Sequence, residues 1–280
     1  MEGKSLKQAF EQETGVDHRE ASLAVEKGPP RPVDNTLFCR YELKYRIASW
    51  QAAAVEQFVR PYLDLDPYSK LQPDSAYPIV GLYLDSGDFR LYRETLEGEK
   101  NRFKLRVRSY SDEPDSPCFF EIKRRLNNII IKSRGRVKRD DVVRLLSGQS
   151  ALPGAYDTEE EIINQFQLYV SYLNARPVVR VRYRRQAYEG GLDNRVRITF
   201  DRGLCYKVTK KPDVTLNSLG WQRVPLNFVI LEIKFTGRYP AWLGQMVKSL
   251  NLRRSSMSKY ASAIKQSCSL GYYPTPLSVW

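Results

Sequence analysis

The chain has 280 residues, 42% of them hydrophobic and 12% aromatic, which allows a sizeable core and excludes a wholly disordered protein. Lysine and arginine number 45, and aspartate and glutamate number 32. The net charge of +13 favours a polyanionic partner: nucleic acid, an anionic membrane surface or a phosphate-rich ligand. The single histidine, His18, lies in a polar stretch and the four cysteines form no CxxC pair, so histidine-based triads and zinc sites are not expected.

Composition divides the chain into a leader, one domain and a tail. Residues 1–36 are charged and poor in large apolar side chains, and they predict a flexible leader. Residues 37–270 contain no linker-like stretch and predict a single domain, followed by a C-terminal tail at 271–280. No apolar run reaches the roughly 18 residues of a transmembrane helix, and no signal-peptide pattern is seen, so we expect a cytoplasmic protein.

Helical patterns recur along this domain between strand-like segments. They predict helices over residues 50–59, 88–96, 140–146, 158–174, 240–250 and 258–267. Ser49 and Asp88 are the expected N-caps of the first two helices, and Pro61 is expected to end the first. Residues 78–85 predict a strand.

Seven further segments alternate charged and apolar residues with the period of a strand. They are residues 40–47, 102–108, 119–125, 132–136, 179–184, 195–201 and 231–235. One polar face is ordinarily solvated, but seven mostly cationic faces are unusual because like charges on neighbouring strands repel. A curled sheet that turns this face inward and covers its apolar face with helices meets both demands. The sequence therefore predicts an α+β fold: an antiparallel β-barrel tunnel with a cationic lumen, with helices packed outside and at the mouth.

A few acidic residues are placed among these bases. Glu42, Glu121, Asp201 and Glu232 each lie on a basic strand face. They either balance the charge locally or bind Mg²⁺ or Mn²⁺, hard cations that take oxygen ligands and bridge phosphates. The pattern alone leaves both interpretations open.

Six segments, in this order along the chain, resemble one known family. They are FCRYELKYRI, YLDSGDFRLYRETLEGEKNRFKLRVRSY, FFEIKRRLNNIIIKSR, ITFDRGL, VILEIKFTGRYPAWL and SSMSKYASAIKQ. Together they resemble the polyphosphate polymerase (vacuolar transporter chaperone, VTC) domain of the CYTH or triphosphate tunnel metalloenzyme superfamily. The resemblance covers about residues 37–268. It implies a phosphotransferase that moves the γ-phosphate of ATP onto a growing polyphosphate chain inside a tunnel, with Mn²⁺ or Mg²⁺ as cofactor.

Carried over to this sequence, the resemblance implies three groups of site residues. The catalytic group is Lys44, Arg106, Arg108, Lys123, Arg182, Arg197 and Lys259. The phosphate-binding group is Arg40, Lys104, Lys132, Arg180 and Lys234. The metal-binding group is Glu232, Glu42 and Glu121. We also expect Arg106, Arg182 and Arg197 to converge on one lumen.

One departure from the superfamily bears on the reaction. Many of its hydrolases begin with E-x-E-x-K, whereas this chain has Arg40, Glu42 and Lys44 at those positions. Fewer carboxylates and more cations favour holding a long polyanion over activating water at two metal ions. Polymerase is therefore preferred, but a tri- or polyphosphatase and a non-catalytic polyphosphate or nucleotide sensor remain as alternatives.

The expected partners follow from the same reasoning. ATP and inorganic polyphosphate are the expected ligands. Nucleic acid is not, because the aromatic residues fall mostly on the apolar strand faces, opposite the cations. Family members usually work within membrane assemblies, so a membrane-associated partner protein would bring this chain to the inner face of a membrane.

Overall fold

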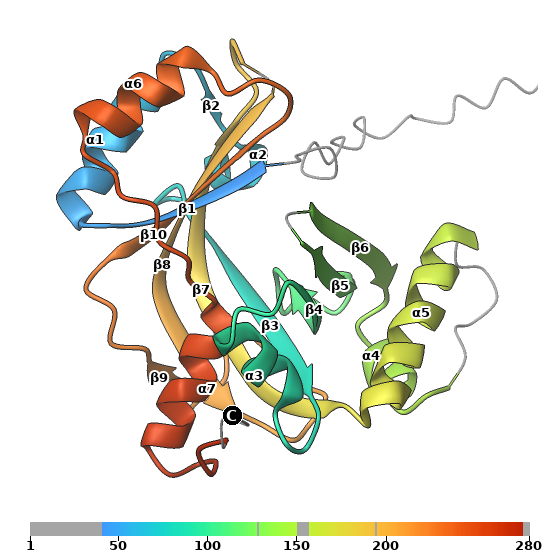
Figure 1. Cartoon of the computed structure of the whole chain (residues 1–280). Coiled ribbons are helices and arrows are strands. Elements are labelled where there is room, and N and C mark those ends of the chain that lie inside the picture. Colours follow the sequence, from blue (N-terminus) through green and yellow to red (C-terminus); the bar gives the residue numbers. More distant parts are fainter. Residues whose placement is uncertain (1–40, 128, 150–156, 194, 277–280) are drawn as a thin grey trace, which may run out of the picture. The chain divides into compact units, whose positions relative to one another are not determined.

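One antiparallel sheet organises the computed structural model of the chain, which describes residues 41–127, 129–149, 157–193 and 195–276 (Figure 1). Its ten strands are β1 (Tyr41–Ile47), β2 (Asp64–Leu65), β3 (Tyr77–Asp85), β4 (Asn101–Ser109), β5 (Cys118–Leu126), β6 (Ile129–Val137), β7 (Arg176–Glu189), β8 (Val196–Val208), β9 (Gln222–Arg223) and β10 (Val229–Phe235). The order across the sheet is β1-β10-β8-β7-β3-β4-β5-β6, with β2 added to β7 and β9 to β8. The predicted leader and the last four residues lie outside the described residues.

The predicted closed barrel is not confirmed. Among the described residues, β1 and β6 are the two edges of the sheet and do not pair with each other. The sheet is nevertheless curved enough for side chains of β1 and β5 to meet, since Lys123 Nζ lies 3.0 Å from Glu42 Oε2. Long charged side chains, rather than backbone hydrogen bonds, bridge the open side.

Seven helices pack against this sheet in the part of the chain that the structure describes. They are α1 (Ser49–Val59), α2 (Pro67–Lys70), α3 (Arg90–Leu96), α4 (Asp141–Leu146), α5 (Asp157–Leu173), α6 (Ala241–Ser249) and α7 (Lys259–Ser269). All except the short α2 were expected from the sequence. Two predicted caps are wrong. Ala48 is the N-cap of α1, and its N–H donates to Gln51 Oε1, while Ser86 Oγ rather than Asp88 accepts from the N–H of Arg90 at the start of α3.

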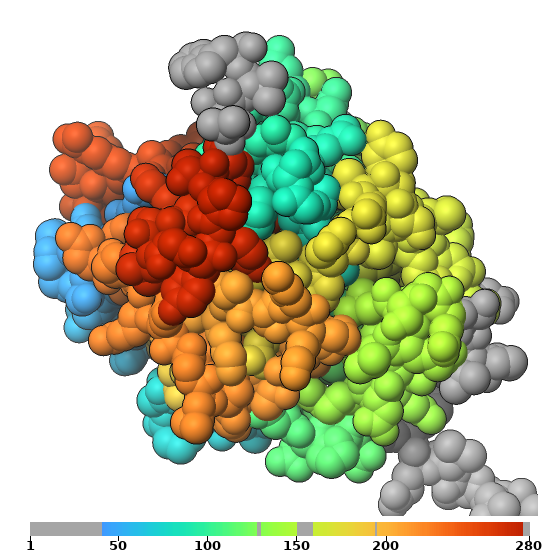
Figure 2. All heavy atoms as spheres, turned by 90° about the horizontal axis from the view of Figure 1, so that it is seen from below, coloured from blue at the N-terminus to red at the C-terminus, as the bar shows by residue number. Residues whose placement is uncertain are grey.

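Three apolar clusters hold the helices on the sheet. The outer faces of β1, β8 and β10 pack on α1 and α6, and those of β3, β4 and β5 pack on α4 and α5. The third cluster is on the inner face, where α7 lies against β7 and β8 and contacts α3. Figure 2, a view from below, shows α7 (red) at the surface beside the orange segment that contains β9. Part of the inner face is therefore apolar and covered by α7, and only the remainder is free to carry charge.

A bulge in β8 sets which of its residues face inward. Arg182 pairs with Cys205 and Arg184 with Arg202, so both Gly203 and Leu204 stand opposite Tyr183. Gly203 has a φ of 64°, a conformation that glycine adopts without a steric cost. The extra residue keeps Asp201 and Leu204 on the same face, although their spacing in the sequence is odd.

Candidate functional site

One wall of the site is formed by β4, β5 and β6 and is almost entirely cationic. Cross-strand pairing places Lys104 opposite Lys123, and Lys123 opposite Lys132. Like charges directly opposite each other in a sheet are destabilising. A row of three lysines is therefore costly for the protein alone, and an anion bound over the row would offset the repulsion.

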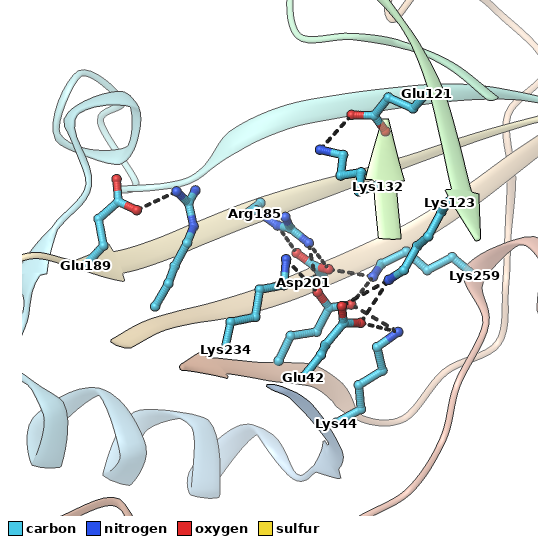
Figure 3. Close-up of polar contacts among 12 residues, drawn as sticks. Glu42, Lys44, Glu121, Lys123, Lys132, Arg185, Glu189, Asp201, Lys234 and Lys259 are labelled. Atoms are coloured by element: carbon cyan, nitrogen blue, oxygen red, sulfur yellow. Dashed lines mark hydrogen bonds and ion pairs between the residues drawn. The ribbon is translucent and has the colours of Figure 1, made fainter. Parts of the chain in front are cut away.

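The facing wall, formed by β1, β10 and β8, contains the carboxylates. Its first row pairs Glu42 with Lys234, and the next pairs Lys44 with Glu232. Lys44 Nζ lies 2.9 Å from Glu42 Oε1 and 3.7 Å from Glu232 Oε1, so one ammonium group sits between two carboxylates (Figure 3). The two carboxylates are therefore close enough to share one positively charged group.

A cavity of about 160 Å³ lies between these walls. Nine cationic side chains and two carboxylates line it, together with tyrosine and serine side chains. The lining residues that the sequence predicted are Glu42, Lys44, Lys104, Arg106, Arg108, Lys123, Lys132, Glu232, Lys234 and Lys259. The sheet thus brings together side chains from both ends of the domain in one strongly cationic cavity.

The carboxylates in the cavity are held ionised by their neighbours. Burial alone would raise the pKa of Glu42, but the ammonium groups of Lys123 and Lys44 hold it well below its ordinary value. Burial acts on Glu232 in the same direction, and Lys259 and Lys44 hold its pKa well below the usual range. Both groups are therefore anionic at neutral pH and able to bind a cation.

Lys259 enters the cavity from the first turn of α7. Its Nζ lies 2.6 Å from Asp201 Oδ2 and 3.3 Å from Glu232 Oε1. Burial would lower the pKa of Lys259, but these two carboxylates raise it above its ordinary value. The residue before it, Ser258, caps the helix by accepting from the N–H of Ala261. Lys259 thus reaches the cavity from the last helix of the described residues, and a closing role for that helix stays a prediction.

Lys104 differs from the other cavity lysines because, among the described residues, its charged neighbours are cations and no carboxylate pairs with it. Burial lowers the pKa of Lys104 well below its ordinary value, and Lys44 and Lys123 act in the same direction. Its Nζ donates to Ser258 Oγ at 2.8 Å. A bound anion would reverse this effect by stabilising the charged ammonium group.

Glu121 does not lie with the other two predicted metal ligands. Its side chain is fully buried, 2.6 Å from Arg106 Nε and 3.0 Å from Lys132 Nζ, with Arg108 and Arg134 at 3.7 Å. Burial would raise its pKa, but the arginines hold the pKa well below the ordinary value. Four cations occupy its surroundings, so Glu121 is the internal counter-ion of the cationic wall. Its assignment as a metal ligand does not fit this position.

Arg180 and Arg182 lie on the opposite side of the sheet from the cavity, so their predicted grouping with Arg106 is wrong. Arg180 Nη1 lies 2.6 Å from Asp213 Oδ2, and Arg182 Nη1 donates to the carbonyl oxygen of Leu216 at 2.9 Å. Both guanidinium groups stack near Trp221. On this part of β7 the apolar side chains point inward, because α7 packs on them. The alternation of charged and apolar residues does not show which of the two faces is the inner one.

Arg197 is on the inner face but does not line the cavity. Its guanidinium group is paired with Glu189 and Asp66. Figure 3 places Glu189 away from the cluster around Glu42 and Asp201. Of the three arginines expected to converge, only Arg106 lines the cavity, so that expectation is wrong. Arg40, the remaining predicted residue, lies outside the described residues.

Sequence reasoning missed Arg185, which lines the cavity. Its guanidinium group donates two hydrogen bonds of 2.7 Å to Asp201, and Nη2 lies 3.5 Å from Glu232 Oε2. Arg185 and Asp201 are cross-strand partners in the β7–β8 pairing. Pairing the predicted strands at 179–184 and 195–201 as an antiparallel hairpin would have pointed to Arg185. Asp201, the only acidic residue of the second strand, then faces an arginine.

One lysine substitution in the cavity and one arginine substitution on the outer face should differ in their effect on anion binding. Lys104→Ala is expected to weaken binding of inorganic tripolyphosphate by about tenfold or more, since a charge-assisted hydrogen bond contributes about 1.5–3 kcal/mol. Arg182→Ala is expected to change this affinity by less than about twofold, although it loses the Leu216 contact and about 1 kcal/mol of stability. Isothermal titration calorimetry and thermal unfolding measure the two effects. Equal losses of affinity would contradict the assignment of faces.

The fold and the cavity define an α+β protein with a strongly cationic cavity between two walls of a curved antiparallel sheet. The family model of the VTC domain matches residues 39–268. The chain therefore belongs to the VTC domain family, as the sequence motifs indicated.

Comparisons with individual proteins give more distant similarity. The chain is 23% identical over 228 residues to the vacuolar transporter chaperone complex subunit 4 of Schizosaccharomyces pombe. That match covers 68% of this chain and 31% of the relative, so the chain spans about a third of the relative's length. A Bacillus halodurans structure, provisionally named an adenylate cyclase, aligns over 79% of this chain and 94% of its own, with 11% identity and a TM-score of 0.45. The mimivirus capping enzyme triphosphatase aligns over 76% and 88%, with 10% identity and a TM-score of 0.32.

Two further findings concern membranes and metals. In the described ranges, no helix has both the length and the apolar character needed to cross a bilayer. Over the same ranges, no group of three or more histidine, cysteine, aspartate or glutamate side chains is arranged to hold a metal ion.

Proposed function

We propose that this domain is a metal-dependent polyphosphate polymerase that transfers the γ-phosphate of ATP to the end of an inorganic polyphosphate chain. The row of Lys104, Lys123 and Lys132 facing the carboxylates of Glu42 and Glu232 is the observation that carries the proposal. A cation-lined wall suits phosphate oxygens, and a carboxylate wall suits the metal ion that accompanies a nucleotide. Membership of the VTC domain family and the resemblance to its polymerases support the same reaction.

The donor set fits Mg²⁺ or Mn²⁺. Such ions are commonly held by one or two carboxylates together with substrate phosphates and water, and Glu42 and Glu232 already surround one positive group. These two residues would hold the ion. When bound, the metal supplies charge neutralisation and orientation at the transferring phosphate.

The residues of the chain itself would bind and orient the phosphates. Arginine presents a planar fork to phosphate oxygens, which suits Arg106 and Arg108 for fixing the γ-phosphate, and lysines act as point charges along the chain. Arg108 Nε is buried and donates no hydrogen bond among the described residues, and its ion pair with Glu121 is long, at 3.7 Å. Phosphoryl transfer relies mainly on such positioning and charge neutralisation.

No protein nucleophile is required for this reaction. A terminal oxygen of the polyphosphate chain forms a bond to the γ-phosphorus, and the bond from that phosphorus to the β-bridging oxygen breaks. ADP leaves with the electron pair, and the polymer is one phosphate longer. The fixed cations offset charge on both the attacking and the leaving oxygens.

Incubation of the purified protein with ATP and Mn²⁺ tests the proposal. ADP and an acid-insoluble phosphate polymer are the expected products, with orthophosphate as a minor one, and Lys104→Ala should slow polymer formation at least tenfold. Stoichiometric orthophosphate without polymer would instead indicate a tri- or polyphosphatase. Binding of polyphosphate without turnover in Mg²⁺, Mn²⁺ or Co²⁺ would indicate a sensor. A membrane-associated partner stays a prediction drawn from the resemblance, and a cytoplasmic location stays a prediction drawn from the sequence.

A further inference from the structure

A buried carboxylate behind the cavity is used neither for phosphate nor for metal. Asp85 ends β3, and its side chain has no exposed surface. Its oxygens accept from the backbone N–H groups of Ser86 at 2.8 Å, Leu91 at 2.9 Å and Tyr92 at 3.0 Å. Leu91 and Tyr92 are in the first turn of α3, where free N–H groups favour an anion. These three backbone N–H groups therefore hold the Asp85 carboxyl group in a fixed position.

A further contact of Asp85 reaches α7, the helix that begins at Lys259. Tyr260, the second residue of α7, donates its hydroxyl to Asp85 Oδ2. The residue before Tyr260 is Lys259, whose ammonium group lies between Asp201 and Glu232 in the cavity. One hydrogen bond thus ties the end of β3 to the helical turn that carries a cavity lysine.

The ring of Tyr260 makes a second link to the cavity. It stacks on Tyr83 with ring centroids 5.0 Å apart and planes inclined by 18°. The Tyr83 hydroxyl accepts from Arg106 Nη1 at 3.2 Å, and Tyr83 itself lines the cavity. Tyr260 therefore lies behind both a lysine from α7 and an arginine from β4, without lining the cavity itself.

We propose that Asp85 and Tyr260 are positioning residues that fix the first turn of α7, so that the Lys259 ammonium group meets the phosphates at the required place. This inference rests on the proposed phosphate-binding function of the cavity. Fixed charges favour a ligand most when they need no rearrangement on binding. A hydrogen bond to a carboxylate that is itself held by three backbone N–H groups supplies such rigidity. Displacement of a charged group by about 1 Å is enough to weaken its action by up to about a hundredfold.

Tyr260→Phe tests the inference, because it removes the hydroxyl and keeps the stacked ring. Its affinity for inorganic tripolyphosphate, measured by calorimetry without metal, should fall about tenfold. Tyr273→Phe is the matched control. Its hydroxyl donates to the Val178 carbonyl oxygen at 2.7 Å, in the same part of the fold but away from Lys259. The control should lose less than about twofold in affinity while its melting temperature falls as much as that of Tyr260→Phe.

A double-mutant cycle distinguishes positioning from general stability. In a Lys259→Ala background, Tyr260→Phe should lower the affinity by less than about threefold, because the group it positions is gone. Asp85→Asn should also weaken tripolyphosphate binding in the wild-type background and have little effect in the Lys259→Ala background. It provides an independent test if Tyr260→Phe folds poorly. Equal losses in both backgrounds, or no loss beyond that of Tyr273→Phe, would overturn the inference.

Failure of the positioning role can be distinguished from failure of the proposed polymerase reaction. A wild-type protein that binds tripolyphosphate but makes no polymer would overturn the polymerase and leave this comparison intact. A wild-type protein with no affinity for tripolyphosphate would overturn both, because the positioning role requires an anion in the cavity.

Discussion

Glu232→Gln is expected to lower ATP turnover at least a hundredfold while the protein stays folded. Glu232 lies near the centre of β10, and its oxygens are within 4 Å of three lysines and of Arg185. Glutamine has the same size but lacks the negative charge that the proposed metal ion would require. Metals contribute several kcal/mol to transition-state stabilisation, and each 1.36 kcal/mol is a factor of ten in rate. Turnover is measured as ADP release at limiting Mn²⁺.

The same variant gives a second readout that does not depend on catalysis. Removing one negative charge from a cavity lined by cations should strengthen metal-free binding of tripolyphosphate by a few-fold, and added salt should reduce the gain. Glu189→Gln is a matched control, because Glu189 pairs with Arg197 away from the cavity. It should keep turnover within about twofold of wild type. Unchanged turnover in Glu232→Gln at limiting Mn²⁺ would rule out the metal-binding role.

The strands of this fold were predictable because their period-2 pattern is unusually regular. The segment predicted over 102–108 is β4 (Asn101–Ser109), and that over 231–235 is part of β10 (Val229–Phe235). Charged side chains on one face and apolar ones on the other leave little ambiguity about local structure. Closure of the sheet was not predictable in this way, because the pairing of two edge strands depends on curvature accumulated over the whole sheet.

The errors in the site come from the same limit. Alternation shows that Arg180 and Arg182 share a face, but not which face is the inner one. The answer depends on α7, from a distant part of the chain, which packs on Val179 and Val181 and makes that part of the inner face apolar. Lys104 and Glu232 face the cavity from β4 and β10, whereas α7 packs on β7 and β8.

Arg185 was missed because a one-residue bulge in β8 changes the pairing of β7 and β8. It shares a face with Val181 and Tyr183, so simple alternation assigns it to the apolar side of β7. The bulge at Gly203 changes the pairing, and Arg185 meets Asp201 directly across the two strands. Sequence patterns describe a regular strand, and functional residues at such irregular places are the ones they miss.

Glu121→Gln is expected to destabilise the protein by about 3–5 kcal/mol, the usual cost of removing one partner from a buried ion cluster. The four cations around Glu121 would then face a neutral amide. Glu94→Gln is the control, since Glu94 forms an exposed i,i+4 pair with Arg90 that contributes at most about 0.5 kcal/mol. Urea unfolding of the three proteins measures the difference. A Glu121→Gln protein as stable as wild type would contradict the counter-ion role.

The pH dependence of this difference follows from the pKa of Glu121. Burial would raise that pKa, but Arg106 and Arg108 hold it well below the ordinary 4.5 in the folded protein. The stabilisation is therefore fully present above about pH 4.5 and is lost as the pH falls through the lower, folded value. Glu121→Gln has no proton to bind, so its deficit relative to wild type should shrink in acid. Tripolyphosphate should also raise the melting temperature of this variant more than that of wild type, because a bound polyanion offsets the repulsion that Glu121 otherwise balances.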